Sequence, residues 1–306
     1  IVGLLLTLGA AVTPAQTSRA RSALRFHAAT AEARAAIDQR VQIHVSLLRG
    51  VAGYMASGVE VDRERFRRYI ERLDLTNSYP GVEGGGFSAR VRPEDRAALE
   101  GAVRSWGQPE FRLWPDGPRD ETHAIILLEP LNARNRRALG FNMFSEPARR
   151  AAMERARDTG VAAASGAVRL VQEQGEIQPQ SGFLIYVPVY AGGGLPTGVD
   201  ARREQLLGFA YSPFRADDLL RGIFADRDRS EVAFAIYDGS RPDAAALLHR
   251  SPHFGGPNYR PAFTASETLN VAGRPWTILY SSQPAFDASG DAYVAPLAAV
   301  VGALLS

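Results

Sequence analysis

The sequence predicts an α+β fold, in which a long N-terminal stalk helix precedes two modules built on antiparallel sheets. Three observations predict it. Residues 15–57 keep one helical pattern without interruption. Short strand-like apolar runs then alternate with amphipathic helices, and this order occurs twice along the chain. The length of 306 residues suits one large domain or two ordinary ones, and the apolar fraction of 45% is enough for a sizeable core.

The predicted stalk helix carries an apolar seam. Pro14 lies near the start of this helix and Gly58 follows its end. The seam residues recur at alternating steps of four and three positions, as in a coiled coil; they are Ile37, Val41, His44, Leu48, Val51 and Met55. This pattern fits two structures equally: a stalk that pairs in a homodimer, or a helix that packs on its own domain. In either structure, we expect His44 to be a histidine that is tolerated in a core or an interface and not a ligand.

The first module follows a second helix, which Asp62 caps and which carries Phe66 and Ile70 on one face. Helices are also predicted from Pro93 to about Trp106, and from a cap at Ser145 to Gly160. Strands are predicted at 84–91, 110–114, 124–130, 139–144, 167–171, 182–190 and 206–214. The stretch 191–200 is rich in glycine and predicts a hairpin-like loop.

A short amphipathic helix at 215–224 predicts the boundary to the second module. Beyond it, strands are expected at 231–240 and 246–251, and a hairpin with a glycine turn at 267–282. The predicted parts are therefore the stalk and second helix at 15–75, a membrane-distal module at 76–225 and a membrane-proximal module at 226–290.

Both ends of the chain are uncharged and apolar, over residues 1–14 and 291–306 apart from Asp291. A membrane-spanning helix needs about 20 apolar residues, so we expect the end of one span and the start of the next. The alternative is a pair of buried terminal helices. Two spans would place the region between them on one side of a membrane.

Composition and motifs argue against several classes of protein. The formal charge is +2, and the arginines are scattered among acidic residues, so nucleic-acid binding is not expected. The chain has no cysteine and shows no nucleotide-binding, hydrolase or metalloprotease motif. Pro252 separates His249 from His253, which argues against a helical zinc pair. We therefore expect no cofactor, no metal and no catalytic residue.

Two carboxylates, Glu129 and Glu173, stand at the ends of apolar strands and must be hydrogen-bonded or exposed there. Each either contacts a ligand or pairs with an arginine. A hydrolase that uses one of them is a further alternative, but no recognisable nucleophile and base accompany them in the sequence.

Several segments, taken in their order and spacing, resemble a CHASE domain over roughly residues 55–225. They are YPGV (79–82), GGFSARV (85–91), FRLWPDG (111–117), residues 127–160, VRLVQE (168–173), GFLIYVPVY (182–190) and LLGFAYSPFRADDLL (206–220). The resemblance implies two PAS-like modules that lie outside the cytoplasmic membrane between two spans. It also implies an output module of the histidine kinase or diguanylate cyclase type, and a purine or cytokinin-like ligand in the distal module.

The resemblance further implies a pocket. Asn142 occupies the position where plant relatives use an aspartate against the purine; an asparagine both donates and accepts, and alternatively it satisfies backbone groups. The other expected ligand contacts are Ala164, Ser165, Leu170, Glu173, Tyr186, Gly208 and Ala210. The sequence thus predicts an extracytoplasmic ligand-sensing domain of a transmembrane receptor and not an enzyme. The alternative is an ectodomain for dimerisation or partner sensing without a small ligand.

Overall fold

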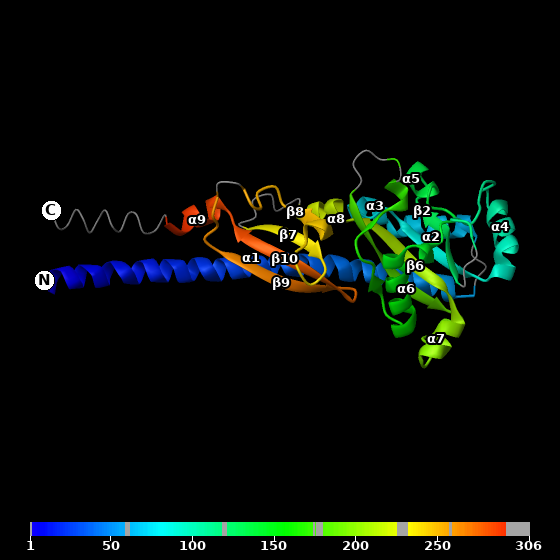
Figure 1. Ribbon diagram of the computed structural model, residues 1–306, viewed down its shortest axis with the longest axis horizontal. Helices are drawn as coiled ribbons and strands as arrows, with labels where there is room; N and C mark the ends of the chain where they lie inside the picture. The colour runs from blue at the N-terminus through cyan, green and yellow to red at the C-terminus, as the bar shows by residue number, and fades with distance from the viewer. Residues whose placement is uncertain are drawn as a thin grey trace.

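A computed structural model describes residues 2–58, 62–117, 121–173, 175, 180–224, 232–256 and 259–291, with the backbone alone at 2–16, 76–77 and 290–291. Figure 1 shows an elongated molecule in which α1 (Val2–Ala56) runs beside a small module and into a larger one. The chain from 63 to 224 forms the distal module, and the chain from 232 to 282 forms the proximal module. The predicted fold class, a long helix followed by two modules with antiparallel sheets, is confirmed.

The distal module is built around a six-stranded antiparallel sheet, with the strand order β2-β1-β6-β5-β3 and β4 paired to β5. Its elements are α2 (Arg63–Leu73), α3 (Leu75–Ser78), β1 (Gly85–Val91), α4 (Arg96–Ser105), β2 (Thr122–Glu129), α5 (Ala133–Arg136), α6 (Pro147–Thr159), β3 (Ala163–Ala164), β4 (Val168–Arg169), β5 (Ser181–Tyr190), α7 (Val199–Gln205), β6 (Leu206–Arg215) and α8 (Ala216–Phe224). The short helical turns are η1 (Pro93–Asp95), η2 (Met143–Ser145) and η3 (Val171–Glu173).

The proximal module has a four-stranded antiparallel sheet in the order β8-β7-β10-β9. Its elements are β7 (Val232–Asp238), η5 (Ala244–Ala246), β8 (Leu247–Arg250), β9 (Thr264–Val271), β10 (Arg274–Ser282) and α9 (Pro284–Asp291). The predicted hairpin is present, and Gly273 in its turn has a φ of +77°, which favours glycine.

Two predicted strands are wrong. In 110–114, Phe111 and Leu113 are buried and Arg112 is exposed, so the alternation of burial is right. Within the described chain, however, the segment's ladder contact is a single bridge from Trp114 to Phe141. The segment 139–144 is not a strand either, because Gly140 has a φ of +78° and turns the chain toward η2.

The predicted cap of α6 is also displaced by one residue. Glu146, and not Ser145, caps the helix, since its carboxylate accepts from the N–H groups of Ala148 and Arg149. The Ser145 hydroxyl donates instead to the Asn142 carbonyl at 2.7 Å. The end of the helix at Gly160, with a φ of +76°, is confirmed.

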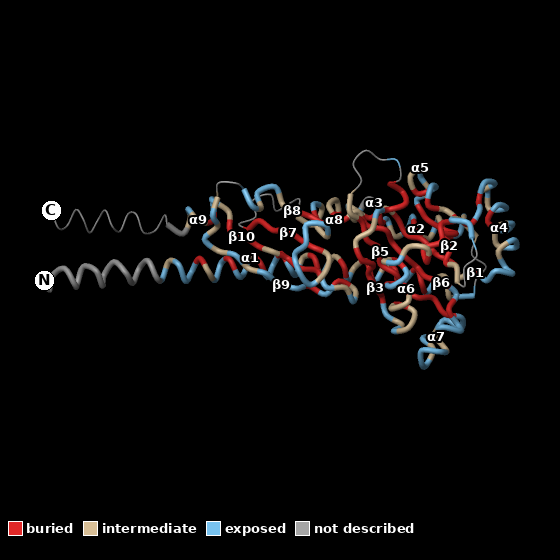
Figure 2. The backbone as a smooth tube through the Cα atoms, viewed as in Figure 1, coloured by how far each residue is buried: buried red, intermediate tan, exposed pale blue. Residues whose placement is uncertain are grey.

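The seam of α1 packs against the chain itself. Ile37, Val41, Leu48 and Val51 are buried in one hydrophobic core that runs between α1 and both sheets. In Figure 2 the buried residues of α1 lie on the side that faces the modules. Of the two predicted roles of the seam, the structure therefore shows intramolecular packing.

The last helix returns to α1 at the end of the molecule remote from the distal sheet (Figure 1). Phe286 of α9 packs edge-on against Phe26 of α1, and the Arg25 side chain donates to the Ser289 hydroxyl at 3.2 Å. The predicted spans at 1–14 and 291–306 lie where the structure describes at most the backbone. Within the part of the chain that the structure describes, no helix is both long enough and apolar enough to cross a membrane.

Candidate functional site

The face of the distal sheet that α6 covers carries two tyrosines side by side. Tyr186 of β5 and Tyr211 of β6 are register partners, so their side chains leave the sheet on the same face. Both side chains are fully buried. Gly86 of β1 is the register partner of Tyr211 on its other side, and a Cβ at Gly86 would lie 2.6 Å from the Tyr211 ring. The sheet therefore accommodates the Tyr211 ring because residue 86 has no side chain.

Arg149 reaches this face from the first turn of α6. Pro147 begins the helix, and its fixed φ suits that position. The buried residues of α6 recur at helical spacing and are otherwise apolar and mostly small: Arg149, Ala152, Met153 and Ala156. A large cationic side chain at the end of an alanine-rich helix face is therefore held directly against the sheet.

The guanidinium of Arg149 is buried with little to balance its charge. The residue is 2% exposed. Its Nη2 donates to the Arg169 carbonyl at 3.2 Å, and the guanidinium lies 5.3 Å from the Phe141 ring centroid. Among the described residues the carboxylate paired with it is Glu146, at 3.7 Å, and that group already caps the helix. Burying a cation is costly until an anion and hydrogen bonds compensate it.

The hydroxyls of Tyr186 and Tyr211, and Nε of Arg149, have no hydrogen-bond partner within the part of the chain that the structure describes. Burial raises the pKa of both phenols, and the charge of Arg149 opposes that rise; at Tyr186 a direct interaction of the hydroxyl with the Arg149 side chain opposes it as well. The three groups are thus electrostatic neighbours, and we call them the Arg–Tyr cluster. Each unpaired buried polar group costs about 1–3 kcal/mol, so the gathering of three on one sheet face makes the Arg–Tyr cluster a candidate site for a polar ligand.

Aromatic side chains pack around the Arg–Tyr cluster. The rings of Phe209 and Tyr186 meet edge-on with centroids 6.0 Å apart. His123 lies 4.3 Å from Phe144 and 5.1 Å from Phe209, by ring centroids. Burial lowers the pKa of His123, although a 3.0 Å contact with Glu121 opposes that shift, so the ring is neutral near pH 7. The surroundings can therefore hold the apolar part of a molecule whose charged end meets Arg149.

Among the sequence-predicted contacts, Tyr186 belongs to the Arg–Tyr cluster, and Leu170 lies in the same hydrophobic core beneath α6. Leu170 packs closely on β5, since a Cβ at Gly182 would meet its side chain at 2.5 Å. These two residues are the ones that the structure places on this face.

Asn142 lies near this region but lines a separate pocket. Its side-chain oxygen accepts from the N–H groups of His123 and Phe144 at 3.0 and 3.1 Å. It also lines a pocket of about 220 Å³ with Arg96, Trp114 and other residues. The structure shows the predicted backbone-satisfying role of Asn142, and a ligand contact there stays a prediction.

Ala164 and Ala210 are buried in the core that faces α1. A Cβ at Gly208 would meet Phe87, a residue of that same core, so this glycine also lies on the α1 face. The Ser165 hydroxyl donates to the Gly166 carbonyl and accepts from the Leu184 N–H at 3.0 Å. The ligand contacts of all four residues stay predictions, and Ala164, Gly208 and Ala210 lie on the sheet face opposite to the Arg–Tyr cluster.

Glu173 is fully buried and takes part in an ion-pair network. Its carboxylate contacts Arg215 Nε at 2.8 Å and Arg134 Nη2 at 3.4 Å, and it accepts from the Gln180 N–H at 2.9 Å. Glu129 is similarly paired, with Arg63 at 3.2 Å and the Leu131 N–H at 2.7 Å. Both carboxylates thus make the arginine pairs predicted as one of their two roles.

Arg149 and Tyr211 were not predicted from the sequence. One signal for Arg149 is its place on the Ala152, Met153 and Ala156 face of a helix whose other arginines fall elsewhere. The signal for Tyr211 is its position in β6 opposite a tyrosine of β5, but it becomes visible only when the register of the two strands is known.

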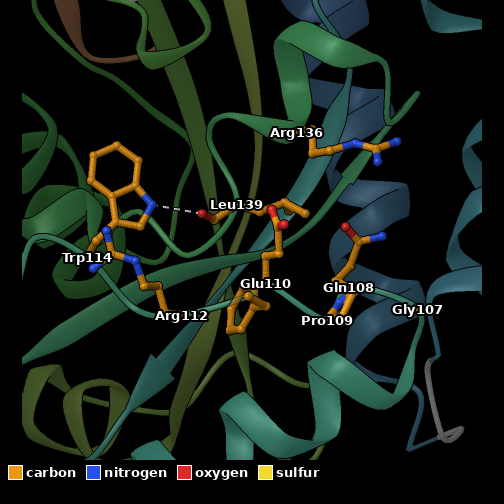
Figure 3. A pocket seen from close by; sticks show the side chains of 9 residues that line it. Gly107, Gln108, Pro109, Glu110, Arg112, Trp114, Arg136 and Leu139 are labelled. Atoms are coloured by element: carbon orange, nitrogen blue, oxygen red, sulfur yellow. Dashed lines mark hydrogen bonds between the residues drawn. The ribbon is translucent and has the colours of Figure 1, made fainter.

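A second cavity, of about 420 Å³, lies at the end of α4, between the α4–β2 connection and α5. Figure 3 shows Gln108, Glu110, Arg112 and Arg136 around it, and the dashed Trp114 Nε1 bond to the Leu139 carbonyl measures 2.8 Å. Glu110, Arg112 and Arg136 are exposed. Since exposed polar groups are satisfied by water, this cavity offers less binding energy than the buried cluster.

The CHASE domain family profile matches residues 59–249, well over half of the chain. The chain therefore belongs to the CHASE domain family, whose members are sensor domains.

Two solved structures resemble the fold at 12% sequence identity. One is an extracellular ligand-binding receptor from Desulfohalobium retbaense, with a TM-score of 0.45 over 81% of this chain. This chain spans 39% of that receptor's length. The other is the ligand-binding domain of the Pseudomonas aeruginosa amino-acid chemoreceptor PctC in complex with GABA, with a TM-score of 0.43, covering 83% of this chain and 96% of that one. Among curated protein sequences, no relative matches this chain.

Proposed function

We propose that this chain is the extracytoplasmic sensing region of a bacterial transmembrane receptor and binds a small molecule in its distal module, on the sheet face beneath α6. The observation that carries the proposal is the Arg–Tyr cluster, in which three polar groups are buried together without full compensation. Membership of a family of sensor domains supports it. A bound molecule that supplies acceptors would convert this unfavourable arrangement into a stabilising one.

The contacts between the modules supply a route for the signal. The β3–β4 segment, which borders the cluster, touches the proximal hairpin: the Ala164 N–H donates to the Ala272 carbonyl at 2.9 Å. The Ala167 N–H donates to the Asp238 carboxylate at 2.8 Å, and Asp238 pairs with both Nε and Nη2 of Arg274 at 2.6 and 2.7 Å. A shift of the β3–β4 segment would therefore disturb these contacts with Asp238 of β7 and Arg274 of β10.

Helix α6 is joined to the same place. The Arg155 side chain donates to the Ala164 carbonyl at 2.7 Å, two helical turns from Arg149. The last strand, β10, leads directly into α9, which packs on α1. Closure of α6 over a ligand would thus act on the two segments nearest the ends of the chain. A ligand drives this change only if it binds the closed state better than the open one.

The remaining parts of the proposal are the location and the partners. The apolar ends at 1–14 and 291–306 support a pair of spans in the cytoplasmic membrane, with the sensing region outside. The output module would be of the histidine kinase or diguanylate cyclase type, and the active form would be a homodimer. Because the α1 seam is occupied by the chain's own core, dimerisation would use other surfaces.

The test is a thermal-shift screen of the full chain against purines, cytokinins, amino acids and organic acids. A ligand at 100 times its Kd adds about 2.7 kcal/mol to the free energy of unfolding. We expect a stabilising compound whose effect is weakened by Tyr186→Phe and not by Tyr280→Phe, a change to another buried tyrosine in the proximal module. A folded protein that responds to nothing in the panel would favour partner sensing.

A further inference from the structure

The donors of the Arg–Tyr cluster define the chemistry of its ligand. A guanidinium donates hydrogen bonds but cannot accept them, and each phenol can do either. The Arg169 carbonyl accepts from Nη2 of Arg149, while Nε of Arg149 lies 3.7 Å from the Glu146 carboxylate and makes no hydrogen bond within the described chain. The arrangement therefore suits a ligand group that is anionic and that carries acceptor atoms close together.

The charge balance at the site favours a single negative charge. One guanidinium lies in the cluster, and Glu146, at 3.7 Å, already offsets part of its charge. Both phenols are neutral near pH 7, and burial raises their pKa further above that value; the nearby His123 is neutral too because burial lowers its pKa. A phosphate dianion would leave excess negative charge in a dry site, which is costly. A carboxylate matches both the charge and the paired-acceptor geometry of an arginine.

We infer that the distal module binds a small organic carboxylate, with its oxygens between Arg149 and the hydroxyls of Tyr186 and Tyr211. The apolar part of the ligand packs against Phe141 and Phe209. This inference rests on the proposed function, because it names the ligand class of the same site.

The cluster is closed over in this structure, since Arg149 is 2% exposed and both tyrosines are fully buried. Entry therefore requires α6 and the η2 turn to move away from the sheet. Arg149 is anchored at the first turn of α6, so a carboxylate bound to it would draw that end of the helix back to the sheet. The same ion pair that gives affinity would then give the conformational change.

The experiment measures Kd by calorimetry, and thermal stability, for the full chain. The probes are acetate, propionate, butyrate and benzoate at constant ionic strength, with the matched uncharged amides propionamide and benzamide and with inorganic phosphate. We expect at least one carboxylate to bind and stabilise the protein while its amide and phosphate do not.

Three variants locate the binding. Arg149→Met should weaken carboxylate binding roughly ten- to a hundredfold, since it removes a charge-assisted hydrogen bond. Tyr186→Phe should weaken it roughly three- to tenfold, since it removes a neutral one. Tyr280→Phe is the matched control: its hydroxyl is also buried and unpartnered among the described residues, but it lies in the proximal sheet, and the Kd should not change.

The outcomes separate this inference from the proposed function. If no carboxylate in the panel binds, or if binding survives unchanged in Arg149→Met, the inference is overturned. If an uncharged compound binds instead and Tyr186→Phe weakens it, the distal module remains the sensing site and only the carboxylate assignment falls. If Arg149→Met does not fold, Tyr186→Phe alone decides, because it removes a single oxygen atom.

Discussion

Replacing Glu173 with glutamine separates its two predicted roles, ion pair and ligand contact. The carboxylate is fully buried and pairs with Arg215 and Arg134, whose side chains are 20% and 30% exposed. Breaking a buried pair costs about 3–5 kcal/mol when the partner stays fully buried. Because both arginines reach water, we expect about 2–3 kcal/mol, which corresponds to a fall in Tm of roughly 4–12 °C.

Thermal unfolding of the full chain followed by circular dichroism measures this loss. The control is Glu64→Gln, which removes a carboxylate that pairs with Arg67 and Arg68 on the exposed surface of α2. Exposed pairs contribute little, so its Tm should stay at the wild-type value. An unchanged Tm for Glu173→Gln, together with loss of binding for a ligand found in the screen, would refute the ion-pair reasoning and make Glu173 a ligand contact.

Three further predictions follow from individual sites. Burial, and then the charge of Arg40, lower the pKa of His44 to about 4. The pKa of His44 in the unfolded chain is about 6.5, so as the pH falls from about 6.5 to 4 the unfolded chain binds a proton that the folded chain does not. The free energy of unfolding should therefore fall by up to about 3 kcal/mol over this range. The loss in urea unfolding should be smaller in His44→Phe, and an equal pH dependence would contradict this. Asp238→Asn should speed amide exchange at Ala167, since it weakens the contact between the modules; unchanged exchange would show that this contact does not hold the segment. Gly86→Ala should cost about 1–3 kcal/mol and abolish binding, because its Cβ displaces the Tyr211 ring; Gly101→Ala, with open space around it, should retain both stability and binding.

The order of the elements could be predicted because each depends on nearby residues. The helical period of α1, the Asp62 cap and the turn at Gly273 all act within a few positions of the chain. The segment 110–114 shows the limit of such patterns. Its alternation correctly predicts which side chains are buried, but pairing depends on a partner strand, and the chain there faces the irregular turn at Gly140 instead.

The candidate site was harder to predict because it joins residues from distant segments. Tyr186 could be predicted as a site residue from its position in a strand. Its neighbour Tyr211 could not, because their proximity depends on the register between β5 and β6. Gly208 and Ala210 lie two positions apart on β6 and therefore share one face, and that face packs toward α1. The alternation of side chains along a strand predicts which residues share a face. Which of the two faces packs against α1 and which against α6 depends on the packing of these helices and not on the strand sequence.

If the proposed function holds, the placement of Arg149 would link binding to signalling through one side chain. A buried, poorly balanced cation makes the closed state of α6 less stable than an apolar residue would. Without an anion, that penalty favours a looser helix, and with one it disappears. Arg155 of α6 donates to the Ala164 carbonyl, and the Ala164 N–H donates to Ala272 of the proximal hairpin. Under the proposed function, a ligand that removes the penalty at Arg149 would act on the proximal module through these two bonds. Arg149→Met should therefore stabilise the ligand-free chain while removing its response, whereas a purely structural arginine would destabilise it when lost.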